Sequence, residues 1–149
     1  MQTPDHLFIA QINRLIAINN ERFRTYSRAM EKSNDPNFRS HCEQAKERTL
    51  YFNMQLIRCL VEYDQFPADS EIKPGKTHRL GMIFERDRGL LHRIRGVNKS
   101  ACGWWDTIAL KAYRSVLTDL QHIPQEITRI ILQQQSILES EQRYLHISA

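Results

Sequence analysis

Apolar side chains between residues 36 and 63 recur at alternating steps of four and three. This is the spacing of one face of an α-helix, because 3.6 residues complete a turn. The repeat continues through eight positions, Phe38, Cys42, Ala45, Thr49, Phe52, Leu56, Cys59 and Tyr63. Such a long amphipathic helix needs other helices to cover its apolar face, so the stretch is typical of a helical bundle.

Three other stretches, residues 4–32, 98–120 and 124–146, show similar helical spacing. Their predicted inward-facing positions are Phe8, Ile12, Leu15, Asn19, Phe23, Tyr26 and Met30, then Ala101, Trp105, Ile108, Ala112, Val116 and Leu120, and finally Ile127, Ile131, Gln134, Leu138, Glu141 and Leu145. A link of three residues joins the first helix to the second, which predicts antiparallel neighbours. The 149-residue chain is therefore predicted to be one all-α domain, a four-helix bundle spanning residues 1–149.

Proline marks the helix starts. Pro4, Pro36 and Pro124 each open one of the long periodic stretches, and Asp35 stands where a cap of the second helix would lie. Proline is tolerated in a first helical turn, since its missing N–H would have no partner there.

The middle of the chain is predicted to hold a long connection. All five glycines lie between residues 75 and 103. A single helix over residues 77–120 would be about 65 Å long, against about 42 Å for residues 36–63, so it would overhang the bundle. A break near residues 96–98 avoids this. Residues 64–76 and a short basic helix over 77–95 would then form a crossover between helices two and three, as ferritin-like bundles have.

The chain resembles a bacterial family of ferritin-like four-helix proteins that is known as a domain of unknown function. The resemblance covers about residues 7–145 and is carried by Tyr26, Ala29 and Glu31, by Asp35-Pro36, by Thr77 and Gly81, and by Ala112-Tyr113. Where that family tends to have Gly-Glu, this chain has Trp105-Asp106, and Gln142 stands where a histidine would be sought. The resemblance implies a ferritin-like fold and no particular activity.

The ligands of a di-metal centre are missing from the sequence. Such a centre takes a Glu from each of two helices and a Glu-x-x-His pair from each of the others, and no Glu-x-x-His occurs in the chain. We therefore expect no metal ligands and no cofactor. The polar inward positions Asn19, Asp106, Gln134 and Glu141, with Thr49, are predicted to form a hydrogen-bonded polar core layer. A residual mononuclear metal site is the alternative.

The sequence also lacks a nucleophile elbow, a phosphate-binding glycine loop and a dinucleotide fingerprint. The six histidines are scattered, and His41, Cys42 and Glu43 would point in three directions on a helix. We predict no catalytic residues, so a non-enzymatic role is favoured.

The positive charge is concentrated in one segment. Residues 71–100 carry eight Lys or Arg against three Asp or Glu, so this segment is +5 while the whole chain is +4. The arginines Arg79, Arg86, Arg88, Arg93 and Arg95, with the aromatic Trp104, form the candidate interaction surface. Arginine suits carboxylate and phosphate recognition. A solvated helix face, an acidic protein partner, and nucleic acid or anionic lipid bound through residues 73–99 all remain open.

Three cysteines without a CxxC pair indicate a reducing compartment, and the sequence contains no run of about 18 apolar residues. Residues 1–5 lack the basic start and apolar stretch of a signal peptide, so we expect none. We expect a cytoplasmic protein. The favoured function is a helical bundle that acts through protein–protein interaction or self-association. The alternatives are a divergent ferritin-like metal-binding protein and a binder of nucleic acid or anionic surfaces.

Overall fold

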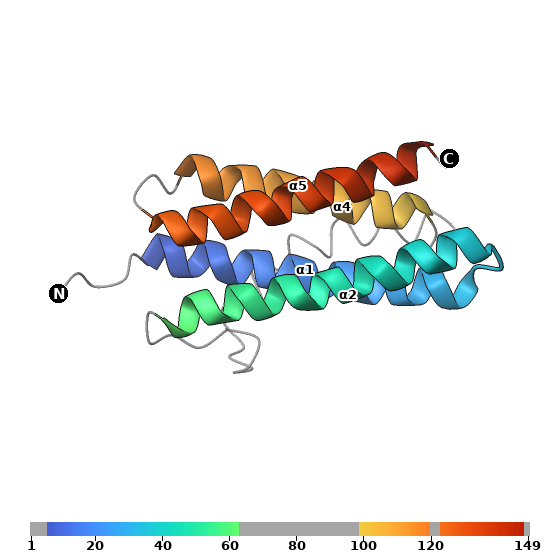
Figure 1. The fold of residues 1–149 in the computed structure, drawn as a ribbon, viewed down its shortest axis with the longest axis horizontal. Helices are drawn as coiled ribbons and strands as arrows, with labels where there is room; N and C mark the ends of the chain where they lie inside the picture. Colours follow the sequence, from blue (N-terminus) through green and yellow to red (C-terminus); the bar gives the residue numbers. More distant parts are fainter. Residues whose placement is uncertain (1–5, 63–98, 120–122, 148–149) are drawn as a thin grey trace.

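The computed structural model describes residues 6–62, 99–119 and 123–147, which form four α-helices and no strand (Figure 1). The helices are α1 (His6–Lys32), α2 (Pro36–Val61), α4 (Lys99–Asp119) and α5 (Gln125–Ile147). The predicted all-α, four-helix architecture is confirmed for this part of the chain. None of these helices is both long and apolar enough to span a bilayer.

The helices pack side by side along their lengths. Helix α1 lies against α2 on one side and α4 on the other, and α5 packs on α4 and closes against α2. Helices α1 and α2 are antiparallel, as the short link requires, whereas α2 and α4 run in the same direction (Figure 1). The start of α4 consequently lies near the start of α2, where Lys99 Nζ is 4.0 Å from Asp35 Oδ2.

The starts of α2 and α5 follow from local chemistry. Pro36 occupies the first turn of α2, and the Asp35 carboxylate accepts a hydrogen bond from the Asn37 N–H at 3.0 Å. This side chain satisfies one of the N–H groups that a helix start leaves without an intrahelical partner. At the start of α5 the Pro124 carbonyl accepts from the N–H of Ile127 at 3.0 Å and of Thr128 at 3.1 Å.

The inward faces of α2 and α5 were predicted correctly at every position that the structure describes. In α1 the prediction was wrong at two positions, because Arg22 and Ala29 are buried while Phe23 and Met30 are partly exposed. In α4 the prediction was wrong at Ile108, which lies at the edge of the core, because its neighbour Ala109 is the one that is fully buried. Adjacent helical residues point about 100° apart, so a choice made on hydrophobicity alone selected the wrong neighbour.

Some predicted features lie outside the described residues. These are the loop 64–76, the helix 77–95, the break at 96–98 and the arginines Arg79, Arg86, Arg88, Arg93 and Arg95.

We expect Asp35→Ala to lower the free energy of unfolding by about 1 kcal/mol, since the variant removes the helix cap. Urea unfolding followed by circular dichroism measures the change. Asp35→Asn keeps a cap and should stay close to the parent, and Asn34→Ala in the same exposed link is the control. If Asp35→Asn is as destabilised as Asp35→Ala, the ion pair with Lys99 rather than the cap is the stabilising contact.

Candidate functional site

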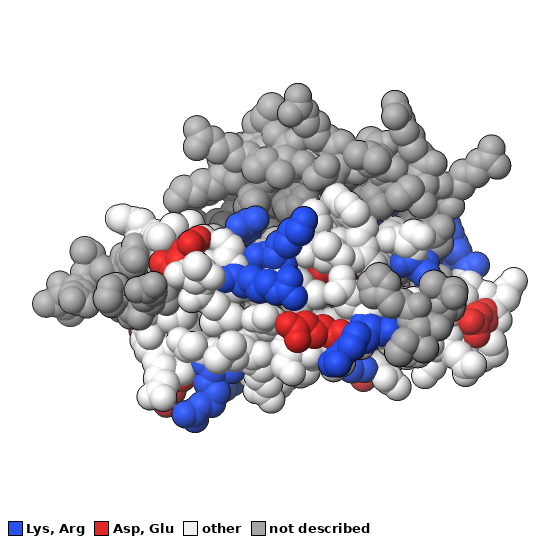
Figure 2. All heavy atoms as spheres, turned by 90° about the horizontal axis from the view of Figure 1, so that it is seen from above, with Lys and Arg blue, Asp and Glu red and all other residues white. Residues whose placement is uncertain are grey.

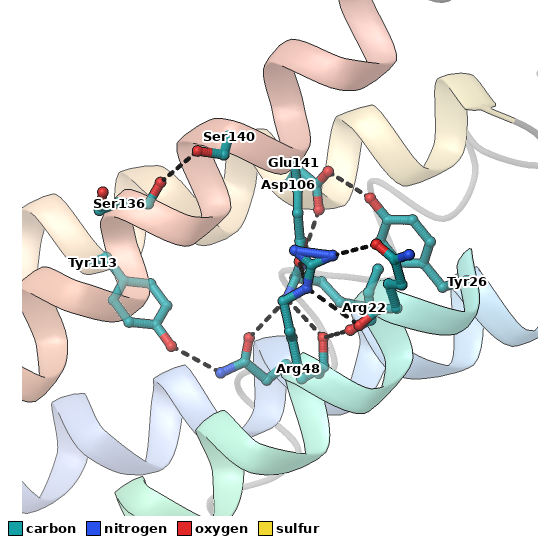
Figure 3. Close-up of polar contacts among 12 residues, drawn as sticks. Arg22, Tyr26, Arg48, Asp106, Tyr113, Ser136, Ser140 and Glu141 are labelled. Carbon is teal, nitrogen blue, oxygen red and sulfur yellow. Dashed lines mark hydrogen bonds and ion pairs between the residues drawn. The ribbon is translucent and has the colours of Figure 1, made fainter. Parts of the chain in front are cut away.

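The guanidinium of Arg22 lies in the middle of the bundle and contacts all three other helices (Figure 3). Its Nε donates to Asp106 Oδ1 on α4 at 2.9 Å, and its Nη2 donates to Glu141 Oε2 on α5 at 2.6 Å. Its Nη1 donates to Thr49 Oγ1 on α2 at 3.0 Å and to Asn19 Oδ1 on its own helix at 3.3 Å. The side chains of Arg22 and Asp106 are completely buried, and that of Glu141 is 1 % exposed.

The charges of this cluster balance only when a second arginine is included. Arg22 faces two carboxylates, which leaves an excess negative charge. Arg48 on α2 lies at the edge of the cluster, with its Nε 3.4 Å from Glu141 Oε1 and its side chain 37 % exposed. The two buried carboxylates are therefore compensated by two cations, the buried Arg22 and the half-exposed Arg48.

Burial and pairing oppose each other in their effect on the Arg22 pKa. Burial lowers this pKa, but the carboxylates of Asp106 and Glu141 raise it by more, so the net pKa lies above the ordinary value and Arg22 stays cationic. Burial raises the pKa of Glu141, and the nearby Arg22 acts against this shift. The pKa of Tyr26 is raised well above its ordinary value by burial and by Asp106, so the phenol stays protonated and donates to Asp106 Oδ2 at 2.7 Å.

A neutral polar layer continues from this cluster toward the other end of the bundle. Asn19 Nδ2 donates to the Tyr113 hydroxyl at 2.9 Å, and that hydroxyl donates to Gln134 Oε1. Gln134 Nε2 in turn donates to the Phe52 carbonyl at 3.2 Å and to Gln55 Oε1 at 3.0 Å. The layer thus connects α1, α4, α5 and α2 by hydrogen bonds in sequence.

The structure brings the predicted polar positions Asn19, Asp106, Gln134 and Glu141 together in this interior network, which we call the Arg22 network. Sequence reasoning missed Arg22, the residue that joins them. The available signal was its spacing, because residues 19, 22, 26 and 29 continue the steps of three and four along α1.

Trp104, assigned to the candidate interaction surface, is partly buried and packs on the main core cluster. Its ring meets the buried Trp105 ring edge to face, with 4.9 Å between centroids. The five arginines that were grouped with Trp104 lie outside the described residues, so the predicted surface is described only at Trp104.

The carboxylates that could serve as metal ligands are occupied by Arg22. Asp106 and Glu141 each give an oxygen to the guanidinium, so a cation between them would first have to displace it. Within residues 6–62, 99–119 and 123–147, no three His, Cys, Asp or Glu side chains are grouped so that they could hold a metal ion. The contacts of Arg22 therefore hold the four helices in register through paired charges and hydrogen bonds.

His41 forms a second buried polar feature near the start of α2. Its ring stacks on Tyr144 at 4.1 Å between centroids and meets the Tyr26 ring edge to face at 5.8 Å. The Nε2 atom is buried and has no hydrogen-bond partner among the described residues. Burial lowers the His41 pKa to about 4, although Asp106 acts in the opposite direction, so the ring is neutral at pH 7.

The described cysteines are free and buried. Burial raises the pKa of Cys42 and of Cys59 to about 11, and it raises the pKa of Cys102 further. Thiolates are the nucleophilic form, so these three side chains act as small apolar core residues.

Comparisons of the chain with protein-family models, with curated proteins and with solved structures found no match in any of the three.

We expect Arg22→Met to lower the free energy of unfolding by about 3–5 kcal/mol, because it leaves buried Asp106 without its cation and buried Glu141 with only the half-exposed Arg48. The triple variant Arg22→Met, Asp106→Leu, Glu141→Met removes the charges together and should be more stable than Arg22→Met alone. Arg24→Met is the control. Arg24 is 61 % exposed and pairs only with Glu21 among the described residues, so its loss should cost less than about 1 kcal/mol. Denaturant unfolding measures all three, and a triple variant less stable than the single one would contradict the assignment.

We expect His41→Phe to flatten the pH dependence of stability between about pH 6.5 and about pH 4. The folded-state pKa lies below the unfolded value of 6.5, so neutral His41 contributes stability that is present above pH 6.5 and lost as the pH falls toward 4. The slope of one proton is about 1.4 kcal/mol per pH unit. Phenylalanine can keep the stacking on Tyr144 and does not titrate. Urea midpoints at several pH values measure the difference, and parallel profiles for parent and variant would rule out this role of His41.

Proposed function

We propose that this protein is a non-enzymatic, ferritin-like helical bundle that acts by associating with proteins, copies of itself included. The observation that carries the proposal is the outer face of α2. Six large apolar side chains are exposed among the described residues, and four of them, Leu50, Tyr51, Met54 and Val61, lie within twelve residues of α2. Grouped exposed apolar side chains mark interaction surfaces more often than scattered ones do.

These side chains are well exposed and share one side of the helix. Their exposed fractions are 52 % for Leu50, 59 % for Tyr51, 65 % for Met54 and 51 % for Val61. Leu50, Met54 and Val61 follow at steps of four and seven, which places them within about 40° of one another around the helix axis. The inward positions of the same turns are occupied by buried residues such as Phe52 and Leu56.

The buried polar groups are consistent with a protein that acts through its surface, because they are already paired with one another. Asp106 and Glu141 are held by Arg22, and Tyr26 and Tyr113 remain protonated within hydrogen bonds. These groups are buried and paired with one another, which is the arrangement of a structural network.

Two observations support the ferritin-like part of the proposal. Helices α2 and α4 run in the same direction, as they do in bundles with a long connection between helices two and three (Figure 1). The cationic group of Arg22 lies between carboxylates of α4 and α5 in the bundle core, where ferritin-like metalloproteins hold their ions.

The two other hypotheses gain no support from the described residues. A metal-binding bundle would require Arg22 to leave its two carboxylates. Binding of nucleic acid was assigned to residues 73–99, of which the structure describes only Lys99. On the face shown in Figure 2, the described residues include both Lys or Arg and Asp or Glu side chains, and a polyanion favours a surface of one sign.

We expect the protein to associate reversibly as its concentration rises from about 1 μM to about 500 μM, a range that covers weak interfaces. Sedimentation velocity measures the distribution of species. Replacing Leu50, Met54 and Val61 together by Gln should shift it toward the monomer, and Leu132→Gln, at the 51 % exposed position on α5, is the matched control. A parent protein that stays monomeric at the highest concentration would contradict self-association.

A further inference from the structure

The side of α2 that faces away from the core carries four residues in a line. Glu47, Tyr51, Met54 and Arg58 follow at steps of four, three and four, which aligns them along the helix. All four are exposed. Thr49, on the opposite side of the same turns, is buried against the Arg22 network. We call the four exposed residues the outer ridge of α2.

The outer ridge has an internal order that makes it complementary to itself. An acidic residue stands at its amino-terminal end, two large apolar residues in its middle and a basic residue at its carboxyl-terminal end. A two-fold axis through the midpoint of the ridge places Glu47 of one copy opposite Arg58 of the other. The same axis places Tyr51 opposite Met54, so each contact occurs twice. A parallel arrangement would instead place Glu47 against Glu47 and Arg58 against Arg58.

The charged ends of the ridge are available for such contacts. The ion pairs among the described residues involve neither Glu47 nor Arg58. The next acidic residues, Glu43 and Glu62, lie on opposite edges of the ridge at helical spacing, so the two-fold arrangement keeps them apart. Leu50 and Val61 flank the ridge and enlarge its apolar area.

We propose that two copies of this chain associate along the outer ridge of α2 in an antiparallel, two-fold arrangement. Glu47 pairs with Arg58 across the interface at each end, and Tyr51 packs on Met54 at the centre. This inference rests on the proposed function and adds to it the partner, a second copy, and the register of the contact. Four ridge positions over three helical turns form a small interface, so the dimer is in equilibrium with the monomer at micromolar concentrations or above.

Charge exchange tests the register. Glu47→Lys alone and Arg58→Glu alone each bring like charges together twice, and we expect either variant to weaken dimerisation about tenfold or more. The double variant Glu47→Lys, Arg58→Glu restores opposite charges and should dimerise as the parent does. An equimolar mixture of the two single variants should form mixed dimers, because each substituted side chain then faces its complement. Glu126→Lys and Arg129→Glu, exposed charges on α5, are the controls.

Sedimentation velocity of each variant and of the mixture decides between the outcomes, with circular dichroism to verify that helix content is unchanged. Weak single variants that are restored in the double variant and in the mixture support the antiparallel ridge. A parent dimer that is indifferent to the exchanges, or a double variant that is not restored, overturns this register and leaves the proposed function standing. A monomeric parent overturns both self-association and the ridge.

Discussion

The burial of one guanidinium group at the centre of the bundle is the constraint on which the rest of the structure depends. An arginine with no access to water must be surrounded by acceptors, since an unpaired buried charge costs several kcal/mol. Arg22 meets this demand with Asp106, Glu141 and Thr49, which come from the three other helices. Rotation or sliding of any one helix would separate a donor from its acceptor. The network therefore fixes the relative register of four helices whose apolar side chains alone would tolerate several packings.

The neutral layer of this network has a different role from that of its charged part. Asn19, Tyr113 and Gln134 form hydrogen bonds with one another that need no counter-charge. Gln134 also donates a hydrogen bond to the backbone carbonyl of Phe52. Apolar side chains surround both layers, so the low dielectric strengthens each bond and penalises any substitute that cannot make it. The interior is consequently specific and closed. Under the proposed function, other proteins bind at the surface instead, where α2 exposes Tyr51 and Met54.

The limits of sequence reasoning are visible in the residue pair Arg22 and Phe23. The repeat of α5 located Gln134 and Glu141 on the inner face because their spacing matched that of Ile127 and Leu138, and the structure has all four buried. In α1 the same repeat could pass through residue 22 or residue 23, and hydrophobicity favoured Phe23. The acceptors that draw Arg22 inward lie 84 and 119 residues away along the chain. Such distant pairing has no local signature, so it becomes apparent only when the helices are assembled.

The interior and the outer ridge of α2 are linked because both are carried by one rigid helix. Thr49 accepts a hydrogen bond from Arg22, and the Phe52 carbonyl and the Gln55 side chain accept hydrogen bonds from Gln134. Hydrogen bonds at three neighbouring positions therefore fix the rotation of α2 about its axis. A helix fixed in rotation on its inner side is fixed on its outer side as well, since its side chains project at set angles. The Arg22 network thereby determines that Glu47, Tyr51, Met54 and Arg58 face outward together. A change in these hydrogen bonds that allowed α2 to turn by one residue, about 100°, would remove the outer ridge without altering any of its residues.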